Sequence, residues 1–344
     1  MSNQQTAFRL TKPGIGTQGI VKVQDPIPTP GAYEVLVRIH AVSLNYRDVA
    51  LLLGTFVPRF NENSVLGSDM GGEVVAVGPS ATQFKKGNRV TGIFNQSHIY
   101  GDNVDGSRIL GGSVDGVLQE YRVFHEQHLL GIPDYLSYEE ASCFPIAAVT
   151  AWNALFGGKQ LVPGQTVVCQ GTGGVSIFAL SLAHAAGATT IVTSSSDDKL
   201  VLAKKLGATH VINYRTTPNW DEVVSELTKG KGVHHIIDNA GVNEIERCFN
   251  CIARGGVINN IGFLGGEPKI SPNVPMLCLK HNASLRGIHV GSKQQFEQLL
   301  RFVEQKQLRP SIDKAFSFEQ TVDAFKYLES GAHFGKVVVR VSSE

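Results

Sequence analysis

The chain has 344 residues, of which 42% are hydrophobic and 18% charged, and its formal net charge is +1. This length favours about two domains, and the low charge without a Lys/Arg-rich cluster argues against nucleic-acid binding. No apolar run reaches the length of a membrane span, and the N-terminus lacks the features of a secretory signal. Five cysteines, an odd number, fit reduced thiols, so we expect a cytoplasmic protein that binds neither nucleic acid nor membrane.

The first third of the chain is predicted to be rich in β-structure. Its expected strands, separated by Pro and Gly, are Gln18–Val23, Glu34–Leu44, Gly72–Val77, Arg89–Phe94 and Leu118–Phe124. This spacing suits a compact antiparallel barrel. The glycine-rich stretch Gly101–Gly116 is interpreted as a mobile loop that could cover a site, with an inert surface insertion as the alternative.

The middle of the chain alternates short apolar runs with helical stretches. The predicted strands are Thr166–Gln170, Thr190–Ser194, His210–Tyr214, His235–Asn239, Val257–Phe263 and Leu285–Val290. The predicted helices are Ser176–Ala186, Asp198–Leu206, Trp220–Thr228 and Glu244–Ala253, the last ended by Gly255. Alternation of this kind indicates a parallel sheet covered on both faces, and six strands is the complement of a doubly wound, Rossmann-type α/β fold.

The tail is predicted as a helix at Lys293–Glu304, a strand at Ile312–Ser317, a helix at Thr321–Ser330 and a strand at Lys336–Val341. The last strand does not belong to the alternating series, so we expect it to return to the N-terminal domain. In the middle region, Cys248 and Cys251 form a lone CxxC without a second pair of ligands, which favours two small apolar residues on one helix face over a zinc site.

A glycine-rich turn predicts a dinucleotide site. The strand Thr166–Gln170 runs directly into Gly171–Ser176 and then into a helix. Gly171 permits the turn, Gly173 allows a pyrophosphate to approach the backbone, and the helix N-terminus supplies N–H donors. Ser176 occupies the third glycine position, so contact between helix and strand there must tolerate a hydroxymethyl group.

The end of the second strand predicts NADP(H) as the cofactor. An NAD site usually places Asp or Glu there, whereas this chain has Ser194 followed by Ser195. Without a carboxylate the 2′-phosphate of NADP is not repelled, and Lys199 can reach it from the next helix. Asp197 and Asp198 argue the other way, unless they only start the helix.

Over nearly its whole length the chain resembles the medium-chain dehydrogenase/reductase superfamily, in its quinone-reductase and enoyl-reductase branch. The resemblance rests on the segments Ser43–Asp48, Gly67–Val74, Val77–Gly78, Lys86–Val90, Thr150–Trp152, Gly171–Ser176 and Leu206–Ala208. It implies a GroES-like β-barrel catalytic domain at 1–135, a Rossmann domain at 136–291, a C-terminal return to the catalytic domain at 292–344, and a cleft between the domains.

The resemblance also implies where the cofactor is held. Lys199 and Tyr214 match positions where NADPH-dependent quinone reductases hold the 2′-phosphate. The full expected set is Thr150, Gly171, Thr172, Gly173, Gly174, Val175, Ser194, Ser195, Lys199, Tyr214, Asn239, Gly241, Ile261, Gly262, Phe263, His289 and Val290.

The chain departs from zinc alcohol dehydrogenases at their metal ligands. Motif by motif, the positions of the Cys, His and Cys ligands carry Asn45, Ser68 and Ile146, which cannot replace thiolate and imidazole. The loop that holds a structural zinc in those enzymes corresponds to Phe94–Leu118, which contains no cysteine. We therefore expect no metal, since a site made of His98, Asp102 and Asp105 is less favoured than a solvated loop.

Without zinc, a carbonyl must be polarised by hydrogen-bond donors, and Asn45, Tyr46 and Arg47 are the candidate catalytic residues. Tyr46 could instead contact the cofactor, and Arg47 could form a structural bridge to Asp48 or Asp69. A tyrosine used by some enoyl reductases matches Phe56, which argues against a dedicated tyrosine acid.

These residues favour hydride transfer from NADPH to an activated C=C bond (enone, enal or enoyl substrate) or to a quinone. The alternatives are a metal-free alcohol or aldehyde reductase and a non-catalytic NADPH-binding protein. The expected partner is a small-molecule substrate. We also expect a homodimer, formed through the last strand of the Rossmann sheet around Ser284–Val290.

Overall fold

The computed structural model describes residues 3–55, 60–102, 105–266, 269 and 271–342. Phe56 lies outside these residues. The chain divides into two compact units, unit 1 (1–149 and 291–344) and unit 2 (150–290). The segment 136–149, expected in the Rossmann domain, lies in unit 1, because Tyr138 stacks on His40 with 4.2 Å between ring centroids.

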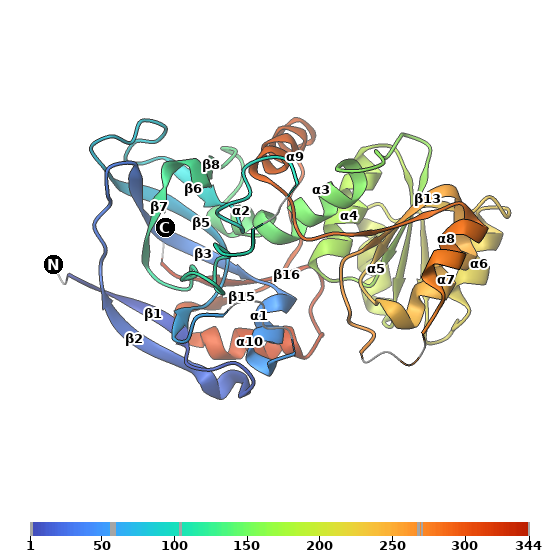
Figure 1. Cartoon of the computed structure of the whole chain (residues 1–344), viewed down its shortest axis with the longest axis horizontal. Coiled ribbons are helices and arrows are strands. Elements are labelled where there is room, and N and C mark those ends of the chain that lie inside the picture. The colour runs from blue at the N-terminus through green and yellow to red at the C-terminus, as the bar shows by residue number, and fades with distance from the viewer. Residues whose placement is uncertain (1–2, 56–59, 103–104, 267–268, 270, 343–344) are drawn as a thin grey trace. The chain divides into compact units, whose positions relative to one another are not determined.

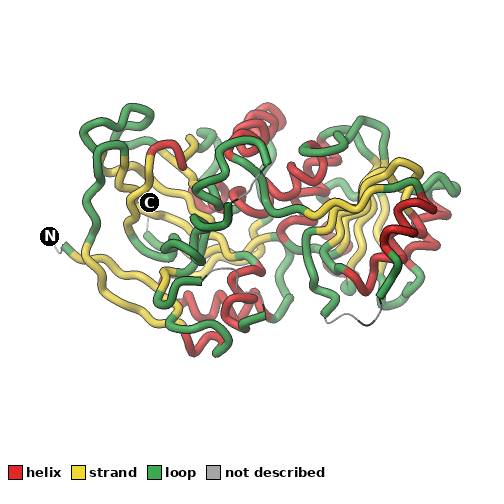
Figure 2. The backbone as a smooth tube through the Cα atoms, in the orientation of Figure 1, coloured by secondary structure: helices red, strands yellow, loops and turns green. Residues whose placement is uncertain are grey.

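Unit 1 is built on two β-sheets (Figures 1 and 2). The larger has the order β15 (Ile312–Ser317), β16 (Lys336–Arg340), β3 (Glu34–Leu44), β5 (Asp69–Val77), β6 (Arg89–Gly92) and β8 (Leu129–Gly131), and β7 (Tyr121–His125) also pairs with β3. The smaller has the order β2 (Ile20–Pro26), β1 (Gln4–Leu10) and β4 (Ser64–Val65). The antiparallel pairing of β16 with β3 returns the C-terminal segment to the N-terminal part of the chain.

The helices of unit 1 pack on these sheets. They are α1 (Tyr46–Leu53), α2 (Tyr138–Ser142), a π-helical turn (Phe144–Ala148), α9 (Lys293–Lys306) and α10 (Thr321–Glu329), with 3-10 turns at Gly16–Gly19, Glu126–His128 and Phe318–Gln320. The core joins apolar side chains from both ends of the chain, among them Val37 and Leu44 of β3, Phe325 of α10 and Val339 of β16. β3 is buried over most of its length on both faces, with only Glu34 and Arg38 partly exposed.

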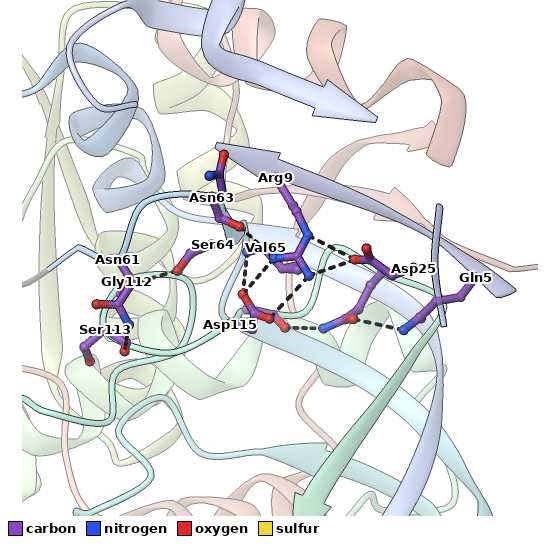
Figure 3. Close-up of polar contacts among 12 residues, drawn as sticks. Gln5, Arg9, Asp25, Asn61, Asn63, Ser64, Val65, Gly112, Ser113 and Asp115 are labelled. Carbon is purple, nitrogen blue, oxygen red and sulfur yellow. Dashed lines mark hydrogen bonds and ion pairs between the residues drawn. The ribbon is translucent and has the colours of Figure 1, made fainter. Parts of the chain in front are cut away.

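The second part of the glycine-rich stretch, residues 109–116, packs against the rest of unit 1, whereas Gly101, Asp102, Asp105 and Arg108 are exposed. Asp115 accepts a hydrogen bond from the Val65 N–H (2.9 Å), and Arg9 lies between the carboxylates of Asp115 (3.3 Å) and Asp25 (2.7 Å), as Figure 3 shows. A Cβ added at Gly116 would lie 2.1 Å from the Gly67 carbonyl oxygen. These contacts hold the end of the stretch against β1 and β4, which the interpretation as an inert surface insertion did not anticipate.

Unit 2 contains one sheet of six parallel strands between helices. Its order is β11 (His210–Asn213), β10 (Thr189–Ser194), β9 (Thr166–Gln170), β12 (Val233–Asp238), β13 (Ile252–Asn260) and β14 (Ser284–Gly287). Numbered from β9, this is the 3-2-1-4-5-6 order of the Rossmann fold. The predicted fold class is confirmed.

The helices of unit 2 cover the sheet. They are α3 (Val149–Phe156), α4 (Gly174–Ala185), α5 (Asp197–Lys205), α6 (Trp220–Leu227), α7 (Ile245–Cys251) and α8 (Val274–His281), with a 3-10 turn at Val242–Glu244. Val168 and Ile258 of the sheet pack with Trp220 and Phe249 of the helices. No helix of the described residues has the length and apolarity needed to cross a membrane.

The predicted boundary between α7 and β13 is wrong. The helix expected to run through Ala253 to Gly255 stops at Cys251, and β13 begins at the next residue. Gly255 lies inside this strand with φ +75°, and its N–H donates to the Asn282 carbonyl (2.6 Å). The register of β12 on β13 shifts here, so Gly255 forms a bulge rather than a helix end. Cys248 and Cys251 are buried free thiols, as the apolar interpretation of the CxxC predicted.

Candidate functional site

The predicted phosphate turn in unit 2 is open. β9 ends at Gln170, Gly171 follows with φ +77°, and Gly173 caps the N-terminus of α4. A Cβ added at Gly171 or at Gly173 would meet no protein atom within 4 Å. Thr172, Gly174 and Val175 complete the turn and the first residues of the helix. The backbone at Gly171 and Gly173 is therefore open to the approach of a pyrophosphate, while the Gly171 N–H itself donates to the Thr193 carbonyl (2.9 Å).

Ser176 uses its hydroxyl to lock the turn to the sheet. Its Oγ donates to the Gln170 carbonyl (2.6 Å) and accepts from Asn239 Nδ2 (2.8 Å). Ser176 is buried at the position that usually carries a third glycine. Its hydrogen bonds link α4 to the end of β9 and to the residue after β12. Asn239, a predicted nicotinamide contact, is thereby fixed in place.

Asp238 begins the segment Asp238–Gly241, which the resemblance matches to nicotinamide and ribose contacts, and its carboxylate holds this segment together. Its Oδ1 accepts from the N–H groups of Ala240 (3.1 Å) and Gly241 (2.9 Å), and its Oδ2 from Asn260 Nδ2 (2.9 Å). The pKa of this fully buried carboxyl is raised by burial, against the lowering effect of the same hydrogen bonds.

The turns after β12 and β13 press directly on each other. Gly241 has φ +84°, and a Cβ added to Gly262 would lie 2.7 Å from the Asn239 carbonyl oxygen. Ile261 and Phe263 flank Gly262, and Phe263 is 46% exposed. The structure therefore brings these predicted contacts together at the carboxyl ends of the strands, where doubly wound folds bind their ligands.

The adenosine end gathers at the neighbouring strands. Ser194 ends β10 and is buried, and Ser195 follows it. Tyr214 directly follows β11, and its N–H donates to the Ser194 carbonyl (3.0 Å). Tyr214, which is 43% exposed, therefore lies beside Ser194. Lys199 lies half-buried in the first turns of α5.

The two carboxylates that argued against NADP lie at the start of α5. Asp197 and Asp198 occupy the first helical turn, and Ser196 caps it. Asp197 accepts a hydrogen bond from Asn213 Nδ2 (2.8 Å), which ties this carboxylate to the end of β11. The placement agrees with a helix-start role for both residues.

The remaining predicted contacts of unit 2 lie near the last strand. Val290 has φ +56°, and its carbonyl accepts from Asn153 Nδ2 (2.6 Å) on α3, one turn after the buried Thr150. His289 is exposed. The Arg286 guanidinium donates to the backbone carbonyl of Asn153 (2.8 Å) and to the Oδ1 of the same residue (2.7 Å).

In unit 1, the turn after β3 is closed by a buried lysine. Asn45 stands between β3 and α1, and its Oδ1 accepts from Lys336 Nζ (2.6 Å), which also donates to the Leu44 carbonyl (2.8 Å). Both side chains are buried, Lys336 at 3% exposure. The sequence analysis did not identify Lys336 as a site residue, although a lysine at the start of an apolar strand could have indicated it.

Asp69 joins this buried cluster. Its carboxylate accepts from Ser68 Oγ (3.0 Å) and from the Ile146 N–H (3.0 Å). Burial raises its pKa to about 6, against the lowering effects of Lys336 and of a hydrogen bond from Asn45.

The positions that match the zinc ligands of relatives thus carry an amide, a hydroxyl and an alkyl group around an ammonium. This set does not fit a zinc ion, because thiolate and imidazole ligands are missing and a fixed positive charge is present. Among the residues that the structure describes, no three His, Cys, Asp or Glu side chains are grouped so as to hold a metal ion. His98 Nε2 instead lies 2.9 Å from the Gly101 carbonyl oxygen.

Arg47 and Tyr46 differ in environment. Arg47 pairs with the buried Asp48 (2.8 Å) and donates to the carbonyls of Leu110 (3.3 Å) and Gly111 (3.0 Å). It therefore occupies the structural position that we weighed against a catalytic one. Tyr46, at the start of α1, is 44% exposed.

Two family models match the chain. One, described as the alcohol dehydrogenase GroES-like domain, covers residues 31–134, and the other, described as zinc-binding dehydrogenase, covers residues 174–305.

Among curated proteins, the chain is 43% identical to a zinc-type alcohol dehydrogenase-like protein of Schizosaccharomyces pombe, over 90% of this chain and 91% of the relative. It is 30% identical to a quinone oxidoreductase-like protein 2 homolog of Nematostella vectensis, over 92% and 85% of the two chains.

Solved structures of alcohol dehydrogenases are also similar to this chain. A Sinorhizobium meliloti 1021 protein assigned as an alcohol dehydrogenase is 37% identical, with a TM-score of 0.91 over 99% of this chain and 100% of the other. An NAD-dependent alcohol dehydrogenase is 32% identical, with a TM-score of 0.88 over 98% and 100%. The chain therefore belongs to the medium-chain dehydrogenase/reductase superfamily and is an NAD(P)-dependent oxidoreductase.

Proposed function

We propose that this oxidoreductase uses NADPH to reduce an activated C=C bond (enone, enal or enoyl substrate) or a quinone, and that it works without zinc. The observation that carries the proposal is that Asn45, Ser68 and Ile146 stand at the positions matching the metal ligands, with the buried Lys336 bonded to Asn45 and the buried Asp69 bonded to Ser68 and to the Ile146 N–H. The resemblance to a quinone oxidoreductase-like protein supports the same class.

Conjugate or quinone reduction suits such a site chemically. When bound, the nicotinamide supplies a hydride, and the protein supplies orientation and a field. In an enone the hydride adds to the β carbon and the α carbon takes a proton from solvent, so no dedicated acid residue is required. Oxidation of a plain alcohol would need a strong electrophile for the developing alkoxide, which is the role of the metal in zinc enzymes.

We propose that Asn45, Tyr46 and Arg47 form the catalytic turn. Within it, Tyr46 would contact the substrate, and Asn45 and Arg47 would position the turn. Tyr46 is the most accessible of the three, so its hydroxyl is the group best able to donate to a substrate carbonyl. Asn45 and Arg47 hold hydrogen bonds to Lys336 and Asp48 respectively, which makes them supports of the turn.

For the cofactor, we propose that NADPH is preferred over NADH. Ser194 stands where a carboxylate would repel the 2′-phosphate, Asp197 is engaged by Asn213, and Lys199 supplies an ammonium nearby in the sequence. Charge-assisted hydrogen bonds contribute roughly 1.5–3 kcal/mol each, and a surplus of about 1.4 kcal/mol gives tenfold discrimination.

The test is NADPH oxidation with an enone, a quinone and an aldehyde in parallel, followed by fluorescence titration of both cofactors. We expect turnover of the enone or quinone and about tenfold weaker NADPH binding by Lys199→Ala, with NADH binding unchanged. Turnover of the aldehyde alone would favour a metal-free carbonyl reductase, and NADPH binding without turnover a non-catalytic protein. About one zinc per chain after purification without chelators would contradict the metal-free reaction.

We also propose that the protein is a cytoplasmic homodimer acting on small molecules. β14 is an edge strand of the unit 2 sheet, and Met276 (55%) and Leu279 (76%) of α8 expose large apolar side chains. A monomeric mass by light scattering at micromolar concentration would contradict the dimer.

A further inference from the structure

Unit 2 has a basic hollow at the amino ends of its parallel strands, whereas the cofactor turns follow the carboxyl ends. We use this name for the pocket of about 560 Å³ lined by the side chains of Lys231, His234, Arg254, Lys280 and His281. It lies where β12 and β13 begin and α8 ends, the orange part of Figure 1. The six-residue strand β12 spans roughly 20 Å, so the hollow is about that far from Asp238.

The walls of the basic hollow are held in one shape by the backbone. The loop after α6 winds through three left-handed residues, Lys229 (φ +54°), Gly230 (+74°) and Gly232 (+74°). A Cβ added to Gly232 would lie 2.6 Å from the Ala253 nitrogen, so this loop is pressed against the start of β13. On the other side, the Gly255 N–H bonds the Asn282 carbonyl and fixes the end of α8 to β13. A ligand would therefore meet a preformed site.

The charge of the hollow is uncompensated. The described lining residues include no Asp or Glu, and Lys231, Arg254 and Lys280 are exposed and form no ion pair with any residue that the structure describes. The three cations come from three different elements, the α6–β12 loop, β13 and α8. All three line the same hollow although they come from separate elements, so their positive charges act on the same space.

Two histidines, His234 and His281, also line the basic hollow. His234 Nδ1 accepts the Thr166 N–H (3.1 Å), so its proton is on Nε2. His281 Nε2 is buried and has no hydrogen-bond partner among the described residues. Burial lowers the pKa of both rings, and positive neighbours lower it further: Lys280 and Arg254 for His281, and Lys159 for His234. An anion in the hollow would relieve this repulsion.

We propose that the basic hollow binds a small molecule that carries a diphosphate group, at a site separate from the cofactor. Three permanent cations match the charge of a diphosphate better than that of a single carboxylate or sulfate, and the Arg254 guanidinium can bind a phosphate in bidentate fashion. The volume leaves room for an organic group attached to the diphosphate. This assignment is independent of the proposed reaction.

The test is isothermal titration of the full-length protein with inorganic pyrophosphate and with ADP, after the cofactor site has been filled with whichever of NADPH and NADH binds more tightly. We expect binding of both probes at low salt and weaker binding at high salt. Arg254→Ala and Lys280→Ala should each weaken pyrophosphate binding about tenfold. Lys205→Ala, which removes an exposed lysine of α5, should change it less than about twofold.

Cofactor affinity and the melting temperature serve as folding controls, because neither depends on these exposed side chains. No pyrophosphate binding to the cofactor-filled protein would overturn the proposal. So would equal binding by the parent and both hollow variants, or sulfate binding as tight as pyrophosphate binding.

Discussion

Two turns of this molecule follow the same local pattern, a strand that ends at the start of a helix, yet they are built in opposite ways. In unit 1, the turn between β3 and α1 is filled by buried charged and polar side chains from Asn45, Asp48 and Lys336. In unit 2, the turn between β9 and α4 is made of Gly171 and Gly173, around which a Cβ would find nothing within 4 Å.

The difference shows where each turn can interact with a ligand. The unit 1 turn satisfies its own hydrogen-bond groups, so its side chains serve mainly to hold one another. The unit 2 turn leaves its backbone at Gly171 and Gly173 uncovered at the N-terminus of α4, where an anion can approach. Substitutions should therefore reduce stability in the first turn and ligand affinity in the second.

The largest effect is expected from Lys336→Met. The change leaves Asn45 Oδ1 and the Leu44 carbonyl without their donor and removes the positive charge that lowers the pKa of Asp69. Breaking a buried charged network of this kind costs about 3–5 kcal/mol. Urea unfolding would measure the loss, with Lys326→Met, at an exposed position of α10, as the matched control. Equal stabilities of the two variants would contradict the role of Lys336.

A smaller, pH-dependent effect is expected at Asp69. Its folded-state pKa of about 6 lies above the ordinary value of 3.8, so the folded state holds the proton that the unfolded state has already lost. The resulting stabilisation is present below the ordinary pKa and disappears as the pH rises through the folded pKa. It amounts to about 3 kcal/mol for two pKa units.

Asp69→Asn removes this titration while keeping an oxygen for the Ile146 N–H. Relative to this variant, the wild type should lose about 2–3 kcal/mol of unfolding free energy between about pH 4 and about pH 7. Chemical denaturation of both proteins across this range measures the difference. A difference that stays flat, or that grows with pH, would show that burial does not raise the pKa of Asp69.

The smallest effect on the fold, and the sharpest on the ligand, is expected from Gly173→Ala. Gly173 has φ −77° and ψ −179°, which alanine adopts without strain, and its Cβ would meet no protein atom. Stability should stay within about 0.5 kcal/mol of the parent, while cofactor affinity falls about tenfold because the methyl group enters the phosphate turn. Gly131→Ala, also unobstructed, is the control. Unchanged cofactor binding would show that the pyrophosphate does not approach Gly173.

The local sequence pattern was sufficient to predict the bounds of strands whose apolar runs coincide with the paired segment. β3, β9 and β15 begin and end where the sequence predicted, because their apolar residues are bounded by turn residues. β1 was missed, since Gln4–Leu10 contains too few β-branched residues to be recognised as a strand. It is a strand because β2 pairs with all seven of its residues. Gly255, expected at a helix end, lies in a strand bulge for the same reason: the pairing of β12 with β13 overrides the local preference.

The sequence alone predicted the alternating strands and helices of unit 2, its doubly wound fold class and its glycine turn, because apolar periodicity and turn residues are local signals. It also pointed to Ser194, Lys199 and Tyr214, which follow their strands at fixed intervals. Only the tertiary structure showed that Lys336 reaches Asn45 across 291 positions, once β16 pairs with β3. Only the tertiary structure, likewise, gathered Lys231, Arg254 and Lys280 around one hollow. Contacts of such long range depend on how the strands are paired, and no local spacing of residues encodes that pairing.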